Sequence, residues 1–188
     1  MLYHVLWPLR DHWIVFNVFR YITFRTALAA MTALLLSFAL GGWLIRKLRD
    51  LQIGQEIRPE GPAAHAGKKG TPTMGGLLIL AAVFVPVLLW ADLGNRFLWI
   101  ALGSTFLFGA IGFVDDYLKL SRRRSLGLTV RRKLLAQTAV AAGVGIALVW
   151  LAGQGQFQLE LAFPFFKRWT PDLGWFYVPF AVLVVVGS

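Results

Sequence analysis

Charged residues are spaced so widely along this chain that four long stretches contain none. These stretches are residues 26–45, 70–91, 97–114 and 134–159. About 20 apolar residues in a helix cross the hydrocarbon core of a bilayer, so the pattern predicts membrane spans near 24–45, 72–91, 97–116 and 134–152. A fifth apolar run, 174–188, ends without a polar flank, and we interpret the chain as a fragment of a longer protein. The expected fold is an all-α polytopic membrane protein, a helical bundle in which residues 1–188 form a single transmembrane domain.

Composition and charge agree with this fold class. The chain is 57% hydrophobic and 15% charged, whereas a soluble domain carries about 25% charged residues. Two loops, after the first and third predicted spans, hold 13 of the 19 basic residues. By the positive-inside rule these loops face the cytoplasm and the N-terminus lies outside. Topology and contact with lipid headgroups therefore explain the net charge of +10, and no nucleic-acid partner is expected.

Two segments outside the spans have patterns of their own. Residues 1–23 mix aromatic side chains with scattered charges, which predicts a helix lying in the membrane interface. Polar and apolar residues alternate over 156–161, and Pro164 and Pro171 follow. Because alternation is a strand signature, we expect a small extracytoplasmic β-hairpin with a structural role.

Asp115 and Asp116 are the strongest candidates for chemistry. They stand side by side at the cytoplasmic end of the third predicted span, where the partial negative charge of a helix C-terminus makes acidic residues unfavourable. Charged groups at membrane depth usually serve a function. A divalent cation would relieve the repulsion, and Mg²⁺ binds one or two carboxylates together with water and substrate phosphates. A catalytic or metal-binding role is therefore predicted for both residues, with nearby basic residues neutralising phosphate charge.

A purely structural interpretation of the acid pair stays open. Lys119 or Arg122, one turn further on, would neutralise an interfacial carboxylate, and Asp115 and Lys119 have the i,i+4 spacing of a helical ion pair. Adjacent side chains point about 100° apart on a helix. We therefore expect that the two acids do not share one partner, so that this interpretation accounts for only one of them.

The loop before the second span offers a candidate anion site. Residues 65–76 read His-Ala-Gly-Lys-Lys-Gly-Thr-Pro-Thr-Met-Gly-Gly, which is not a Walker A loop because no Lys-Ser/Thr follows the glycines. Hydroxyls, ammonium groups and an imidazole would stand at a helix N-terminus, where anions bind. A simple cap, with Thr71 before Pro72, explains the same residues equally well, and His65 alone is more simply a solvated loop histidine. Because the second and third spans are antiparallel neighbours, the loop and the acid pair are expected to face each other as a site for a diphosphate.

The same residues resemble a known family. The run KKGTPTMGG over 68–76 and the segment GFVDDY over 112–117 look like those of the phospho-N-acetylmuramoyl-pentapeptide transferases, a branch of the polyprenyl-phosphate N-acetylhexosamine-1-phosphate transferases. Segments 16–21 and 164–167 are also similar, and the resemblance extends over the whole chain, as the N-terminal half of such a protein. It implies a larger helical bundle in the bacterial cytoplasmic (inner) membrane, with an active site open to the cytoplasm.

The resemblance also implies an activity. Members of the family transfer phospho-MurNAc-pentapeptide from UDP-MurNAc-pentapeptide to undecaprenyl phosphate with Mg²⁺. The products are lipid I and UMP, in the first membrane step of peptidoglycan synthesis. The resemblance makes Asp115 and Asp116 the essential acidic pair, of which one would assist the attacking lipid phosphate and the other would hold the metal or a phosphate.

Five further residues are substrate-binding candidates. Lys68 and Thr73 match loop positions at the nucleotide end of the substrate, and His65 is counted with them. Lys119 and Lys133 are candidates for phosphate contacts. The expected partners are the two substrates, the bilayer and, in a homodimer, a second copy of the chain.

Other functions stay open at this point. A third essential aspartate and a histidine-rich loop of the family would lie beyond Ser188, so we do not expect the piece to turn over alone. A related transferase acting on an N-acetylglucosamine phosphate donor is one alternative. A transporter or flippase for an anionic lipid or sugar phosphate is another, although the uncharged interiors of the spans count against it.

Overall fold

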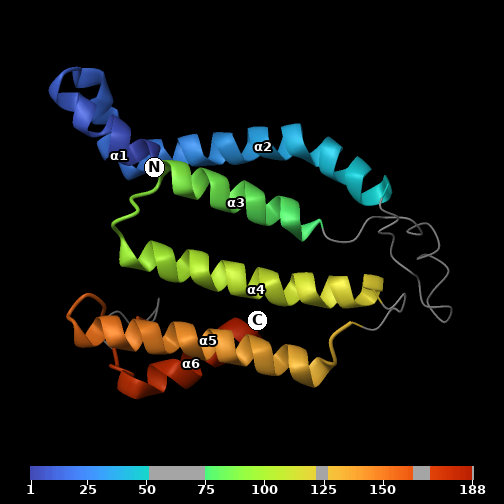
Figure 1. The fold of residues 1–188 in the computed structure, drawn as a ribbon. Coiled ribbons are helices and arrows are strands. Elements are labelled where there is room, and N and C mark those ends of the chain that lie inside the picture. Colours follow the sequence, from blue (N-terminus) through green and yellow to red (C-terminus); the bar gives the residue numbers. More distant parts are fainter. Residues whose placement is uncertain (51–74, 122–126, 163–169, 188) are drawn as a thin grey trace. The chain divides into compact units, whose positions relative to one another are not determined.

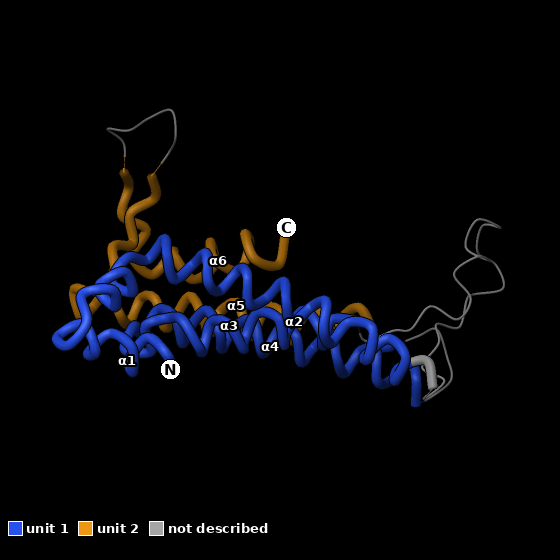
Figure 2. The backbone as a smooth tube through the Cα atoms, turned by 90° about the horizontal axis from the view of Figure 1, so that it is seen from above, with its two compact units in different colours: residues 1–128 blue, residues 129–188 orange. Residues whose placement is uncertain are grey.

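Helices make up most of the described part of the chain. The computed structural model describes residues 1–50, 75–121, 127–162 and 170–187. It divides into two units, residues 1–128 and residues 129–188, which Figure 2 distinguishes by colour. The α-helices of the first unit are α1 (Leu2–Leu6), α2 (Ile22–Asp50), α3 (Gly76–Trp90) and α4 (Arg96–Ser121) (Figure 1). Those of the second unit are α5 (Val130–Gly153) and α6 (Tyr177–Gly187).

Three of the described helices are long and apolar enough to cross a membrane: Ile22–Leu48 of α2, α4 and α5. Two shorter apolar helices, Gly76–Trp90 and Gly174–Gly187, fall within the other two predicted spans, although residues 72–74 lie outside the described residues. Side chains such as Phe38 of α2 are 76% exposed. Apolar surface of this extent fits a hydrocarbon environment, and the prediction of a helical membrane protein is confirmed.

The prediction of one interfacial helix over residues 1–23 is wrong. Pro8 has no backbone N–H and therefore cannot continue α1, and Trp13 has an extended backbone. The segment consists of short pieces, namely α1 and the 3₁₀ helices η1 (Pro8–Asp11) and η2 (Ile14–Arg20).

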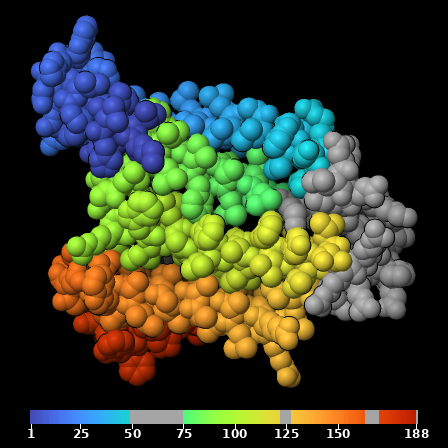
Figure 3. Space-filling view, in the orientation of Figure 1, coloured from blue at the N-terminus to red at the C-terminus, as the bar shows by residue number. Residues whose placement is uncertain are grey.

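This N-terminal segment lies at one end of α2 and α3, as the blue atoms of Figure 3 show. The ring of Phe19 stacks on Trp90 of α3, with 6.1 Å between centroids and 1° between planes. The indole N–H of Trp90 in turn donates a hydrogen bond of 3.0 Å to Oγ1 of Thr32 in α2. One aromatic residue thus connects three parts of the first unit at the same end.

Helices α3 and α4 form a tight hairpin and are the antiparallel neighbours that the sequence predicts. In the connecting turn, the Asp92 carboxylate accepts the N–H of Gly94 (3.0 Å). Oδ1 of Asn95 accepts the N–H of Phe97 (2.9 Å) and so caps the start of α4. Within the first unit, α3 lies between α2 and α4 (Figures 1 and 3).

Gly109 of α4 allows α3 to pack closely. A Cβ atom at this position would lie 2.7 Å from Cδ1 of Leu80. We expect Gly109→Leu to lower the stability by about 1–3 kcal/mol, the usual cost of overpacking, measured as a lower thermal unfolding midpoint of the full-length protein in detergent. Gly103→Leu on the same helix is the control, because a Cβ there meets no atom within 4 Å. Equal midpoints for the two variants would contradict this packing.

In the second unit, α6 packs back along α5. A Cβ at Gly145 of α5 would lie 3.1 Å from the Cα of Val178, so the two helices approach closely at that point. Between them, residues 160 and 172 form one isolated antiparallel bridge. It is flanked by the bonds Leu161 N–H to Pro171 O (3.0 Å) and Leu173 N–H to Leu159 O (3.1 Å). The antiparallel return is therefore present, but the described residues on its two sides contain no extended strand, and residues 163–169 lie outside them.

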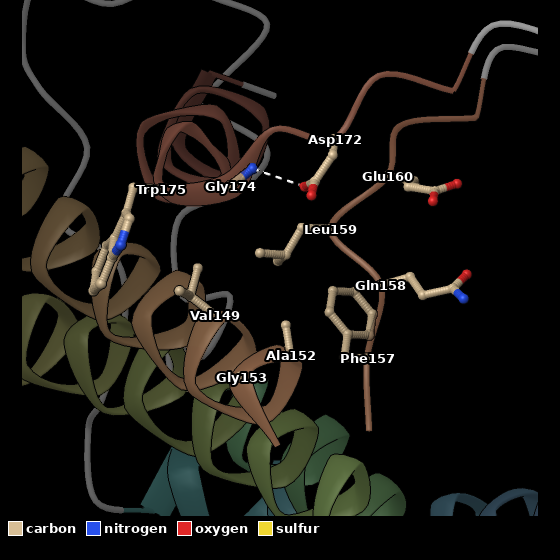
Figure 4. A pocket seen from close by; sticks show the side chains of 10 residues that line it. All are labelled: Val149, Ala152, Gly153, Phe157, Gln158, Leu159, Glu160, Asp172, Gly174 and Trp175. Atoms are coloured by element: carbon tan, nitrogen blue, oxygen red, sulfur yellow. Dashed lines mark hydrogen bonds between the residues drawn. The ribbon is translucent and has the colours of Figure 1, made fainter. Parts of the chain in front are cut away.

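A hollow of about 410 Å³ opens beside this bridge (Figure 4). Val149 and Ala152 of α5 contribute to its apolar side, and Oδ1 of Asp172 accepts the N–H of Gly174 at 2.9 Å. The residues that line the hollow include none of the predicted site residues. Asp115, Asp116 and Lys119 lie instead in the first unit, near the end of α4.

Candidate active site at the end of α4

The acid pair lies near the C-terminal end of α4, and its two members differ in exposure. Asp115 is buried, with 12% of its side chain exposed, whereas 33% of the Asp116 side chain is exposed. Because the two residues are neighbours on one helix, they point to different surroundings. Asp115 faces protein and Asp116 is more open to an incoming ligand.

Lys119 contacts both carboxylates. Its Nζ atom lies 2.7 Å from Oδ2 of Asp115 and 3.3 Å from Oδ1 of Asp116. The predicted i,i+4 pair is confirmed. The expectation that the two acids do not share a partner is wrong, because the flexible stem of a lysine at i+3 and i+4 brings its ammonium group between them.

One ammonium group does not balance two carboxylates. With both acids ionised, the cluster of Asp115, Asp116 and Lys119 retains one net negative charge. It also stands within two turns of the last residue of α4, Ser121, where the helix dipole is negative. Because one lysine serves both acids, the purely structural interpretation gains support. The net negative charge of these three side chains nevertheless suits a bound cation.

A second contact involves the other oxygen of the Asp115 carboxylate. The backbone N–H of Leu128 donates to Oδ1 of Asp115 at 2.7 Å, and Gly127 lies directly against the same carboxylate. Neither residue is predicted from the sequence. No charge, hydropathy or spacing signal marks them, apart from a glycine that follows a basic loop.

The start of α3 lies at the same end of the hairpin as the acids. Leu80 of α3 packs against Gly109 of α4, and the two helices run in opposite directions (Figure 1). Gly76, four residues before Leu80, is therefore placed toward Asp115, six residues after Gly109. This supports the predicted approach of the glycine-threonine loop to the acids, as far as its last residues are described.

The other predicted site residues lie outside the described part of the first unit. His65, Lys68 and Thr73 lie outside the described residues, as does Arg122. Lys133 lies in the first turns of α5, in the second unit, and stays a predicted phosphate contact.

The residues present fit a magnesium ion. Among the described residues, no group of three or more His, Cys, Asp and Glu side chains gathers as an all-protein metal site. Mg²⁺ does not need one, because one or two carboxylates suffice when water and substrate phosphates complete its shell. Asp115 and Asp116 already direct oxygen atoms toward one cationic group, and the same oxygens would hold the ion.

Two protein-family models match parts of this chain. Residues 98–188 match the model of glycosyl transferase family 4, and residues 68–80 match signature 1 of phospho-N-acetylmuramoyl-pentapeptide-transferase.

Over its whole length the chain is also similar to curated proteins named phospho-N-acetylmuramoyl-pentapeptide-transferase. It is 52% identical to the one from Geobacter sp. (strain M21), 53% to that of Desulfosudis oleivorans and 56% to that of Desulfatibacillum aliphaticivorans. Each alignment covers 100% of this chain and 52% of the relative, so the chain spans about half the length of the curated relatives it matches. These matches confirm the resemblance found in the sequence.

Proposed function

We propose that the full-length protein transfers phospho-MurNAc-pentapeptide from UDP-MurNAc-pentapeptide to undecaprenyl phosphate, forming lipid I and releasing UMP. The observation that carries the proposal is the cluster of Asp115, Asp116 and Lys119 at the end of a membrane-length helix. An anionic cluster with a cation in it suits a diphosphate donor that brings its own metal ion. The similarity of the whole chain to the named transferases supports the choice of substrates.

The reaction requires little covalent chemistry from the side chains of the protein. An oxygen of the lipid phosphate attacks the sugar-bearing phosphorus of the donor, and the bond from that phosphorus to the oxygen of the departing UMP breaks. Catalysis of such transfers consists mainly of positioning and of neutralising charge on the phosphoryl oxygens. Asp115 and Asp116 would hold Mg²⁺, which supplies positive charge to the phosphates when bound. Lys119 would direct its ammonium group at the same oxygens.

The proposal includes a topology and further contacts. The site faces the cytoplasm of a bacterial inner membrane, because the loops on its side carry most of the basic residues. The N-terminus and a small hairpin around the 160–172 bridge lie on the outer face. Lys68, Thr73 and His65 contact the nucleotide end of the donor, and Lys133 a phosphate. The partners are both substrates, the bilayer and a second copy of the chain.

Turnover of the full-length protein with defined substrates tests the function. Purified protein with Mg²⁺ and undecaprenyl phosphate is given UDP-MurNAc-pentapeptide or UDP-N-acetylglucosamine, and UMP and the lipid product are measured. We expect both products from the muramoyl donor at a rate at least about 100-fold above that from the other donor. The reverse preference would favour the related transferase. Movement of labelled lipid or sugar phosphate across vesicles without release of UMP would favour a transporter.

A further inference from the structure

The chain that leaves α4 folds back onto Asp115. Oδ1 of this carboxylate accepts the backbone N–H of Leu128, and Oδ2 accepts Nζ of Lys119, both at 2.7 Å. One donor belongs to a flexible side chain on the same helix, and the other to the backbone of a segment 13 residues away in sequence. A carboxylate held on both oxygens in this way cannot rotate without losing a charge-assisted hydrogen bond.

Gly127 is what allows the backbone to come this close. An added Cβ would lie 2.2 Å from Oδ1 of Asp115, 2.7 Å from the Asp115 carbonyl oxygen and 2.9 Å from its Cγ. One of these atoms is helix backbone, which cannot move aside as the end of a long side chain can. The φ angle of Gly127 is not among the positive ones, so glycine is required here for the close approach and not for its backbone conformation.

We propose that Gly127 and Leu128 form a backbone clamp that positions the Asp115 carboxylate for phosphoryl transfer. Neither residue touches substrate, so both are positioning residues that act through Asp115. The inference rests on the proposed function, because only a reacting site gives the orientation of Asp115 a consequence for rate. Outer contacts of metal-binding groups typically contribute 10–100-fold to activity or metal affinity, and small misplacements in an active site cost comparable factors.

Two variants of the full-length protein test the clamp by different routes. Gly127→Ala adds volume against the carboxylate, and Leu128→Pro removes the N–H that binds it. For each we expect kcat to fall about 10–100-fold while KM for the UDP-sugar changes less than about threefold, because the donor contacts are left in place. Gly103→Ala is the matched control, because it adds a methyl group in open space on α4, and it should retain kcat within about twofold. Leu128→Ala keeps the N–H and should lower kcat less than Leu128→Pro does.

A readout that does not depend on turnover tests the contact itself. Gly127→Ala should lower the thermal unfolding midpoint in the parental background, and should lower it less in an Asp115→Ala background, where Oδ1 and Cγ are absent. Equal shifts in the two backgrounds would overturn the placement of Asp115 under the clamp. Normal kcat in a folded Leu128→Pro variant would overturn its role in positioning. A parental protein that makes no lipid product would overturn the proposed function instead, and the coupling of the midpoints would still decide whether the clamp exists.

Discussion

Full-length protein carrying Asp115→Asn is expected to form lipid I at least about 100-fold more slowly than the parent. Removing one charged group that stabilises a transition state commonly costs 10²–10³ in rate. Asparagine also cannot satisfy this particular position. The two carboxylate oxygens each accept a hydrogen bond of 2.7 Å, one from Leu128 and one from Lys119, so the amide NH₂ would have to face a donor in either orientation.

Asp116→Asn should slow the reaction by a similar factor and disturb the fold less. The carbonyl oxygen of the new amide could still accept Lys119, the contact that Oδ1 of Asp116 makes at 3.3 Å. We therefore expect a lower thermal unfolding midpoint for Asp115→Asn than for Asp116→Asn, with both rates measured by UMP release. Asp92→Asn in the α3–α4 turn is the control and should retain the parental rate within about twofold. Lipid I formation near the parental rate in either acid variant would remove the role assigned to it.

Chelation of divalent cations is expected to reduce turnover by more than about 100-fold, with recovery on addition of Mg²⁺. Asp115, Asp116 and Lys119 together keep one net negative charge, and the diphosphate donor adds more. Without a metal ion, these like charges would oppose binding of the donor and development of charge on the phosphoryl oxygens. The measurement is UMP release by full-length protein after treatment with EDTA.

The control for that experiment is EDTA saturated with Mg²⁺ beforehand, which should leave the rate unchanged and so exclude an effect of the chelator on the bilayer or detergent. A rate that is undiminished in free EDTA would show that the acid pair does not act through a metal ion. In that case the basic side chains of the site, Lys119 among them, would have to neutralise the phosphates, and Lys119→Gln would become the decisive variant.

The fold was predictable where it depends on local sequence. Long uncharged runs determine α2, α4 and α5, because the length of an apolar helix follows from the thickness of the bilayer. Helix α4 extends beyond the predicted 97–116 to Ser121, since Lys and Leu residues after the acids are good helix formers. The N-terminal segment was not predictable in the same way. Its aromatic residues serve contacts such as the Phe19–Trp90 stack, which tertiary packing decides.

The candidate site was likewise predictable only where it depends on local sequence. The ion pair of Asp115 and Lys119 follows from their spacing in a helix. That Lys119 also reaches Asp116 depends on the conformation of a flexible side chain. The contact with Leu128 joins residues on either side of an irregular segment, and no periodicity constrains where such a segment returns. The two acids are therefore predictable from the sequence, but the backbone contact that holds Asp115 is not.

The unequal lengths of neighbouring helices have a consequence for the bilayer itself. The uncharged part of α2, residues 26–45, has 20 residues, about 30 Å at 1.5 Å per residue, and α3 has 15, about 22 Å. The hydrocarbon layer measures about 30 Å, so α2 matches it and α3 falls short of it. Local thinning of the lipid around α3 would accommodate the shorter helix. Acyl-chain length thus becomes a physical variable to which this protein should respond.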